Sequence, residues 1–197
     1  MSKNASRSPK HAGFNPRPVL YIAKYEAKTT NRQLRGLPWK RSACWFNKTR
    51  NSVVAAVARA ALHCDTRVLS KHGVDFISVS DDDWHESRVA VVVESTEHAK
   101  ELKKLLIGWR ILAAIPGNDD VHWDKGAAAI VTLMWMAKNN LGADIVVWAA
   151  GGKNKIFGAN PDAPHVVIDF EDAFHHHAEL DTMVRVEHYK SLGFIRG

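Results

Sequence analysis

The chain has 197 residues, of which 46% are hydrophobic and 24% are charged, a composition typical of one globular domain, with room for an appendage. It has no apolar run long enough for a transmembrane helix, and its basic N-terminus lacks the apolar core of a secretory signal. With only two cysteines, Cys44 and Cys64, lying apart in the sequence, we expect reduced thiols and a cytoplasmic protein.

Charge is distributed unevenly along the chain. Residues 1–50 contain twelve Lys or Arg and one acid, Glu26, whereas the remaining 147 residues carry fifteen basic and twenty acidic side chains. A basic arm on a mildly acidic body indicates a polyanionic partner, most often nucleic acid. The alternatives are a solvated tail and an arm that docks another protein.

The first 50 residues divide into two predicted parts. Residues 1–18 are polar and basic, which predicts a disordered tail. Residues 19–50 form a basic arm that begins with a short strand or helix start at 19–27 and carries Trp39 and Trp45. Arginines interleaved with exposed aromatic rings hold phosphates and stack on bases. The preferred interpretation, however, is that the two tryptophans pack the arm onto the body.

A helix is predicted from Asn47 to His63, because small and apolar residues recur on one side of it. Lys48, Arg50, Asn51 and Arg59 are assigned to its polar side. A turn region and a short strand at 75–79 follow. The run Asp81–Asp83 then offers oxygen ligands for a divalent cation, but a polar loop is the preferred interpretation, because consecutive side chains seldom converge on one ion.

The segment from Val89 to Glu94 is an almost unbroken apolar and β-branched run, typical of a strand buried on both faces. Ser95 or Thr96 is placed to cap the helix predicted from Thr96 to Ile107. Four further strands are predicted at 109–115, 127–133, 143–150 and 165–170, with a short helix or loop at 134–141 and a closing helix at 179–192. These alternating elements predict an α/β domain over residues 51–197, with a mostly parallel sheet and helices on both faces.

Motifs for nucleotide or metal chemistry are weak in this chain. It contains no Walker A string, no Gly-x-Gly-x-x-Gly and no Gly-x-Ser-x-Gly, so we expect no cofactor and assign no catalytic residue. Gly151-Gly152-Lys153 resembles a phosphate-binding loop only loosely. His175–His177 looks like a metal site, but adjacent histidines point in different directions, and we assign no metal there.

The order of the segments resembles the C-terminal RecA-like lobe of superfamily 2 helicases and translocases. The resemblance runs from about residue 50 to 172, through Val91-Val-Val-Glu-Ser-Thr-Glu-His-Ala99, the 105–112 and 129–133 segments, Leu141–Gly152 and Val166–Asp172. In that family the strand ending near Glu94-Ser95 belongs to motif IV, and the strand ending at Thr132, with Gly142 and Asp144, looks like motif V. The resemblance implies a RecA-like, Rossmann-like three-layer fold.

The resemblance also implies that Ser95 and Thr132 lie at turns that touch a nucleic-acid backbone; ordinary helix capping is the alternative. The lobe that carries the Walker motifs is absent, and residues 150–165 contain Lys153 and Lys155 but no arginine. We therefore expect no ATP hydrolysis by this chain alone, since phosphoryl transfer needs metal and cationic groups around the γ-phosphate.

The leading hypothesis is a non-catalytic protein that binds DNA or RNA, with no membrane partner and possibly an ATPase partner chain that carries Walker motifs. The residues predicted to contact nucleic acid are Arg32, Arg35, Lys40, Arg41, Lys48, Arg50, Ser95, Thr132, Lys153 and Lys155. One alternative is a metal-dependent hydrolase or nuclease that uses Asp119, Asp120, His122 and Asp124, with Asp169. The other is an interaction module that completes a split helicase.

Overall fold

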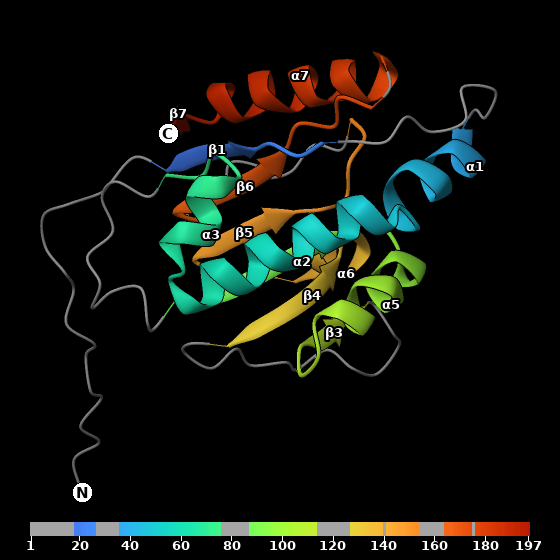
Figure 1. Ribbon diagram of the computed structural model, residues 1–197, viewed down its shortest axis with the longest axis horizontal. Coiled ribbons are helices and arrows are strands. Elements are labelled where there is room, and N and C mark those ends of the chain that lie inside the picture. Colours follow the sequence, from blue (N-terminus) through green and yellow to red (C-terminus); the bar gives the residue numbers. More distant parts are fainter. Residues whose placement is uncertain are drawn as a thin grey trace, which may run out of the picture.

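The computed structural model describes residues 18–26, 36–75, 87–113, 127–139, 141–153, 164–174 and 176–197. These residues form a seven-stranded sheet of order β3-β4-β2-β5-β6-β1-β7, in which every neighbouring pair is parallel (Figure 1). The predicted α/β class with a mostly parallel sheet is confirmed. No helix in the described part of the chain is long and apolar enough to cross a bilayer.

The strands are β1 (Val19–Ala23), β2 (Val89–Val93), β3 (Arg110–Leu112), β4 (Ala128–Thr132), β5 (Ile145–Trp148), β6 (Val166–Phe170) and β7 (Ile195–Arg196). The α-helices are α1 (Gly36–Lys40), α2 (Lys48–His63), α3 (Thr66–Lys71), α5 (Thr96–Leu105), α6 (Leu133–Lys138) and α7 (His176–Ser191). One turn of π-helix, η1 (Arg41–Trp45), joins α1 to the loop before α2.

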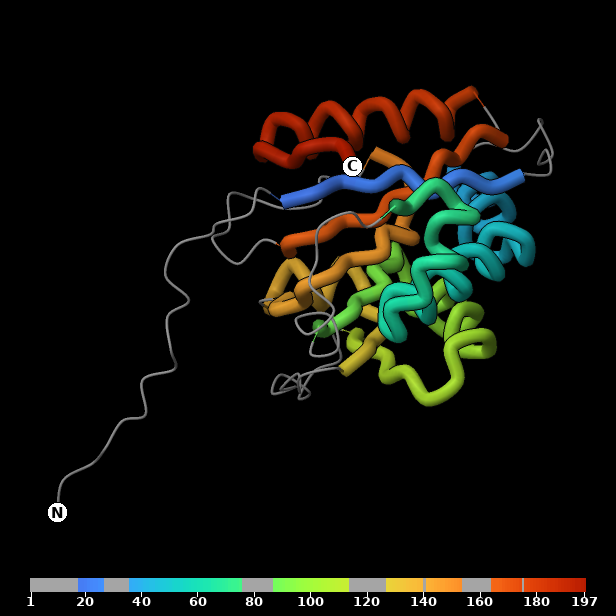
Figure 2. Tube along the Cα trace, turned by 60° about the vertical axis from the view of Figure 1, so that its left-hand side comes forward, coloured from blue at the N-terminus to red at the C-terminus, as the bar shows by residue number. Residues whose placement is uncertain are grey.

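The central strand β2 lies between β4 and β5 and is fully buried. Its side chains alternate between two cores, as the pleat of a strand requires. Val89, Val91 and Val93 pack with α2, α3 and α5, whereas Ala90 and Val92 pack with residues of α6 and α7. The helices therefore cover both faces of the sheet, and the fold has three layers (Figure 2).

The cap predicted for α5 is confirmed, and α2 has a side-chain cap that was not predicted. The Asn47 side chain accepts a hydrogen bond from the backbone N–H of Arg50 and caps α2, and Ser95 caps α5 in the same way through His98. The segment at 134–141, predicted as a helix or loop, contains α6, and the closing helix begins at His176, three residues before its predicted start. The sequence analysis did not predict α3 or β7. Most of the predicted strand at 75–79 and all of Asp81–Asp83 lie outside the described residues.

The described residues before position 50, predicted as an arm beside the 51–197 domain, pack into the body of the fold. Strand β1 lies between β6 and β7 within the sheet. Trp39 and Trp45 are buried in a small core with Phe174 and Ala178, and the rings of Trp39 and Phe174 lie 6.4 Å apart. The preferred interpretation, in which these tryptophans pack the arm onto the body, is therefore confirmed.

The polar side predicted for α2 is also partly wrong. Lys48 and Arg59 are exposed, as expected, but Arg50 and Asn51 are buried. Asn51 donates a hydrogen bond to the carbonyl of Trp45 and faces Nε2 of the buried His98. Residues 50 and 54 are four apart, so Arg50 shares the apolar stripe that begins with Val54.

Candidate functional site

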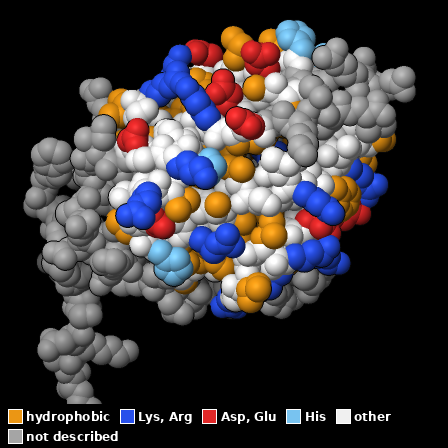
Figure 3. All heavy atoms as spheres, in the orientation of Figure 1, with side chains coloured by type: hydrophobic (Ala, Val, Ile, Leu, Met, Phe, Trp, Pro, Cys, Tyr) orange, Lys and Arg blue, Asp and Glu red, His pale blue; other side chains and the backbone are white. Residues whose placement is uncertain are grey.

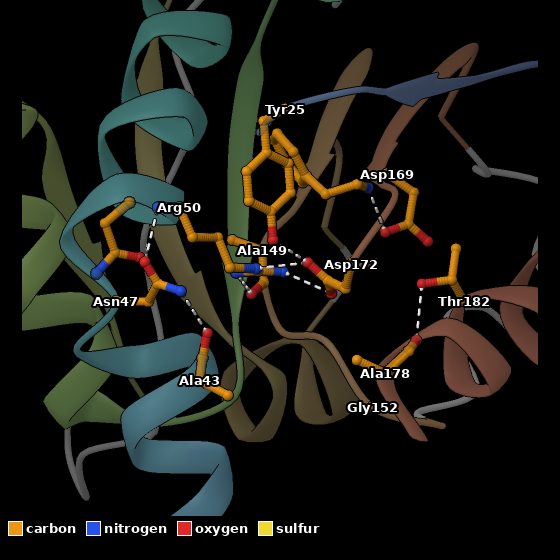
Figure 4. A network of polar contacts seen from close by, with 12 residues as sticks. Tyr25, Ala43, Asn47, Arg50, Ala149, Gly152, Asp169, Asp172, Ala178 and Thr182 are labelled. Carbon is orange, nitrogen blue, oxygen red and sulfur yellow. Dashed lines mark hydrogen bonds and ion pairs between the residues drawn. The ribbon is translucent and has the colours of Figure 1, made fainter. Parts of the chain in front are cut away.

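The carboxyl ends of β1, β5 and β6 meet the first turn of α2 and the middle of α7 at one edge of the sheet. Two arginines and two aspartates are buried there, with Tyr25 beside them. Figure 4 shows Arg50, Asp172 and Tyr25 pointing toward one another. We refer to Arg50, Asp169, Asp172 and Arg185 as the Arg–Asp network. Its members come from α2, β6, the loop after β6 and α7, so only the folded chain brings them together.

Arg50 makes three hydrogen bonds inside the protein and has no exposed surface. Its Nε and Nη2 donate to the two carboxylate oxygens of Asp172, at 2.8 and 3.1 Å, and its Nη1 donates to the carbonyl of Ala149 at 2.8 Å. This paired geometry matches the fork of a guanidinium to a carboxylate. The guanidinium predicted to contact phosphate therefore faces the interior and is already bound.

Arg185, from α7, makes a similar set of contacts. Its Nε and Nη2 donate to Asp169, at 2.7 and 3.1 Å, and its Nη1 donates to the carbonyl of Gly152 at 2.8 Å. Nη2 also lies 3.7 Å from a carboxylate oxygen of Asp172, which links the two ion pairs. Because the four charges cancel, the network is neutral as a whole.

The pKa values of the two carboxyl groups in the network are shifted in opposite directions. Burial alone would raise the pKa of Asp172, but Arg50, Arg185 and a hydrogen bond from Tyr25 outweigh burial and hold that pKa below its usual value. Burial raises the pKa of Asp169, and the single pairing with Arg185 does not fully offset it. Asp172 is thus the better-stabilised anion, because it lies between two arginines.

The glycine-containing turn after β5 binds the protein's own cations. The carbonyls of Ala149 and Gly152 point at Arg50 and Arg185, respectively. Gly151 has a φ of +67°, and a Cβ atom built on it would lie 3.1 Å from the sulfur of Cys44, so both conformation and space favour glycine here. The turn presents carbonyl oxygens to guanidinium groups, whereas a phosphate-binding loop presents backbone N–H groups to an anion.

Cys44 lies against this turn and is buried. Burial raises the pKa of its thiol to about 12, despite the nearby positive charge of Arg50. The group is therefore a neutral thiol at physiological pH, and the thiolate is the form that acts as a nucleophile. Cys44 serves as a packing residue in the small core with Trp39 and Trp45.

A second set of cations lies on the surface at the same edge. Lys40 pairs with Glu94 at 2.5 Å, and Arg41 pairs with Glu97 at 2.7 Å. Glu94 lies in the turn after β2 and Glu97 in the first turn of α5, so two ion pairs tie the α1–η1 segment to the start of α5. Lys48 is exposed at the first turn of α2, and Lys153 is 70% exposed with Asp181 at 4.0 Å.

Ser95 comes shortly after β2, and Thr132 is the last residue of the neighbouring strand β4, where it is aligned with Val93 of β2. The Ser95 hydroxyl accepts a hydrogen bond from the N–H of His98, and the Thr132 hydroxyl accepts one from Trp135. Both are helix caps, which is the alternative considered for them. Thr132 is buried, whereas Ser95 is partly exposed and lies between the two surface ion pairs.

Several predicted site residues lie outside the described part of the chain: Arg32, Arg35, Lys155, Asp119, Asp120, His122 and Asp124. Asp169, the remaining acid of the hydrolase alternative, is buried against Arg185 and is not open to a metal ion. His176 and His177 are exposed in the first turn of α7. Among the described residues, no group of three or more potential ligands could hold a metal ion.

The sequence analysis did not predict Asp172, Arg185 or Tyr25 as members of this site. A signal for Arg185 was present, because it is three residues after the buried Thr182 and four before the buried Tyr189 on α7. A charged residue within an apolar helical stripe indicates a buried partner of opposite charge. The sequence does not identify that partner, Asp169, because it lies on a different element, β6, 16 positions earlier. The partner of Arg50, Asp172, is 122 positions away.

The fold and this site together define a three-layer α/β protein with a parallel sheet and a buried, neutral ion-pair network at the carboxyl edge of that sheet. No protein-family model matches the chain, and no curated protein matches it in sequence.

Proposed function

We propose that this protein binds the phosphate backbone of nucleic acid at the carboxyl edge of its sheet and has no ATPase activity of its own. The observation that carries this proposal is the location of the N-terminal cations. Lys40, Arg41 and Lys48 come from the basic first 50 residues and lie at this edge, where Lys153 is also exposed. Lysine and arginine side chains on one edge attract a polyanion and release its counterions.

The resemblance to a helicase C-terminal lobe supports the same proposal. The segments that carry it form the adjacent strands β3, β4, β2, β5 and β6 of the sheet. Ser95, at the end of β2, lies beside the surface cations, where a hydroxyl and helix N–H groups can meet a phosphate. The arginines at this edge, Arg50 and Arg185, are held by aspartates and carbonyls, which argues against a role on a transferring phosphate.

The test is binding of the full chain to fluorescently labelled single-stranded and double-stranded oligonucleotides over a range of salt concentrations. We expect weak binding whose logarithm falls linearly with the logarithm of salt concentration. Changing Lys40, Arg41 and Lys48 together to Gln should reduce the slope on single-stranded nucleic acid by about 2, since each phosphate contact contributes about 0.7.

A matched control changes the same number of exposed cations elsewhere, with Lys71→Gln, Lys138→Gln and Lys190→Gln. Deletion of residues 1–17 tests the contribution of the N-terminal cations separately. Undetectable binding at low salt, or equal loss in the two triple variants, would contradict the proposal.

A second candidate function, an interaction module that completes a split helicase, is favoured by one feature of α7. Leu180, Met183 and Val184 are 40%, 60% and 49% exposed, and they lie together on the outer side of this helix at helical spacing. An ATPase that co-purifies with the wild-type chain, and that is lost with Met183→Glu, would favour this candidate. Retention of the ATPase by that variant would count against it.

A further inference from the structure

The turn between α5 and β3 exposes one large aliphatic side chain on a well-anchored base. Ile107 is 87% exposed, the highest value among the exposed large hydrophobic side chains of the described residues. Leu106 and Trp109, on either side of it, are buried, and the N–H of Trp109 donates to the carbonyl of Leu106 at 3.2 Å. Gly108 has a φ of +88°, which lets the chain reverse direction there. The buried neighbours hold the turn while Ile107 projects from it.

Cations from three elements surround this turn. Arg59 of α2 donates from Nη1 to the carbonyl of Leu105 at 2.8 Å, and the ammonium group of Lys103 donates to the carbonyl of Trp109. Lys104 is 67% exposed, and Lys100 and Arg110 are exposed as well. One acid, Glu101, pairs with Lys104 at 2.6 Å. The turn therefore carries a net positive charge around an apolar tip.

Ordinary helix chemistry explains only part of this arrangement. Lysines in the last turn of α5 interact favourably with the carboxyl end of the helix dipole. That effect does not require Arg59 or Arg110, which belong to other elements, and it does not account for the exposure of Ile107. An aliphatic side chain in water loses the burial that such residues usually obtain.

The turn lies away from the candidate nucleic-acid site. It precedes β3 and so lies at the amino edge of the sheet, whereas Lys40 and Arg41 lie at the carboxyl edge. In Figures 1 and 2 it forms the lower margin of the molecule. Figure 3, in the orientation of Figure 1, shows hydrophobic side chains bordered by Lys and Arg at the lower margin of the face that it draws.

The sequence analysis predicted no membrane partner, but from this geometry we propose that the α5–β3 turn docks the protein onto an anionic lipid surface. The charge complements negatively charged headgroups, and lysine and arginine stems lie along an interface while their charged ends stay in water. The projecting shape suits a deformable bilayer, into which a single aliphatic side chain can insert without a preformed pocket. This proposal is independent of the nucleic-acid proposal, because the two surfaces lie at opposite edges of the sheet.

The test is co-sedimentation of the full chain with phosphatidylcholine vesicles that contain or lack phosphatidylserine. We expect salt-dependent binding only where phosphatidylserine is present. Ile107→Asn should weaken that binding about tenfold or more, because burial of an isoleucine side chain is lost. Lys100→Gln with Arg110→Gln should weaken binding and reduce its salt dependence.

The control is Met183→Asn, which removes an exposed apolar side chain from α7 and should leave vesicle binding unchanged. Unfolding midpoints of all variants should stay close to that of the wild type, since the changed side chains are exposed. The proposal is overturned if the wild type does not bind the anionic vesicles, or if Ile107→Asn binds them as tightly as the wild type. It is also overturned if Ile107→Asn weakens oligonucleotide binding and leaves vesicle binding intact, which would assign the tip to nucleic acid.

Discussion

Two pairs of cations lie at the same edge of this sheet and have different surroundings. Arg50 and Arg185 are at most 1% exposed, whereas Lys40 and Arg41 are 24% and 45% exposed. The closest nitrogen–oxygen distances are alike, 2.8 and 2.7 Å for the buried pairs and 2.5 and 2.7 Å for the surface pairs. Distance therefore does not separate the two groups; burial does.

Burial matters because an ion loses its hydration when it enters the protein. In the Arg–Asp network, hydrogen bonds to carbonyls and Tyr25 replace part of the lost water, and removing one partner leaves an uncompensated charge. At the surface, water replaces any lost partner, and an exposed pair is worth about 0–1 kcal/mol. The buried pairs thus hold the fold, while the surface pairs can exchange one anion for another.

The largest expected effect is on the buried side. Asp172→Ala should reduce the free energy of unfolding by about 3–5 kcal/mol, since it strands Arg50 in the interior beside Arg185. Denaturant unfolding followed by circular dichroism measures the change. Glu187→Ala, at a residue whose side chain is 71% exposed, is the control and should alter stability by less than about 0.5 kcal/mol. Equal effects of the two variants would mean that burial does not set the contribution of these charged groups to stability.

His98 is a buried titratable group that should make the stability of the protein depend on pH. Burial, with a further contribution from Arg50, lowers the pKa of this histidine from 6.5 to about 3. Below pH 6.5 the unfolded chain binds a proton that the folded chain does not, so the stability associated with His98 falls as the pH falls from 6.5 towards 3. The expected slope is about 1.4 kcal/mol per pH unit, or about 2 kcal/mol between pH 6.5 and 5.

Urea unfolding of the wild type and of His98→Gln at several pH values isolates this contribution. The stability difference between the two proteins should narrow as the pH falls over that interval. His63→Gln, at an exposed histidine, is the control. A difference that stays constant from pH 6.5 to 5 would show that His98 titrates normally in the folded protein.

Tyr25 tests how much one hydrogen bond from an uncharged donor adds to the network. Its hydroxyl donates to Asp172 at 2.9 Å. Tyr25→Phe should reduce the free energy of unfolding by about 1.5 kcal/mol, because the acceptor is charged but remains paired with Arg50. Tyr25→Phe should reduce the free energy of unfolding by less when Asp172 is already Asn. Thermal denaturation of the wild type, the two single variants and the double variant measures this difference. Equal costs in both backgrounds would mean that Tyr25 acts through packing.

The smallest stability effect is expected at the surface pair. Glu97→Gln should change the free energy of unfolding by less than about 1 kcal/mol. If the carboxyl edge binds nucleic acid, the same variant should bind oligonucleotides more tightly, because Arg41 no longer has its carboxylate partner. Glu187→Gln removes the same charge on α7. An equal gain in affinity from that control would indicate a net-charge effect only.

The class of the fold could be predicted from local patterns. The apolar run of β2 predicted a strand buried on both faces, and the alternation of strands with amphipathic segments predicted a parallel sheet. Ser95 was predictable as a cap because capping joins residues only three apart. These features depend on neighbours in the chain, which a sequence displays directly.

The candidate site was only partly predictable. The surface cations Lys40, Arg41 and Lys48 follow from the charge of the first 50 residues, but their acidic partners, Glu94 and Glu97, do not. The position of β1 within the sheet also had no local signal, because a strand of five residues pairs wherever the topology places it.

Only the tertiary structure decided the fate of Arg50. By sequence it is one cation among twelve in a basic segment, and a solvent-facing role was the natural prediction. In the fold, the first turn of α2 meets the carboxyl ends of β5 and β6, and the guanidinium becomes enclosed with Asp172 and the carbonyl of Ala149. A buried charge is stable only where its partners converge on it, and that convergence is a property of the packed chain.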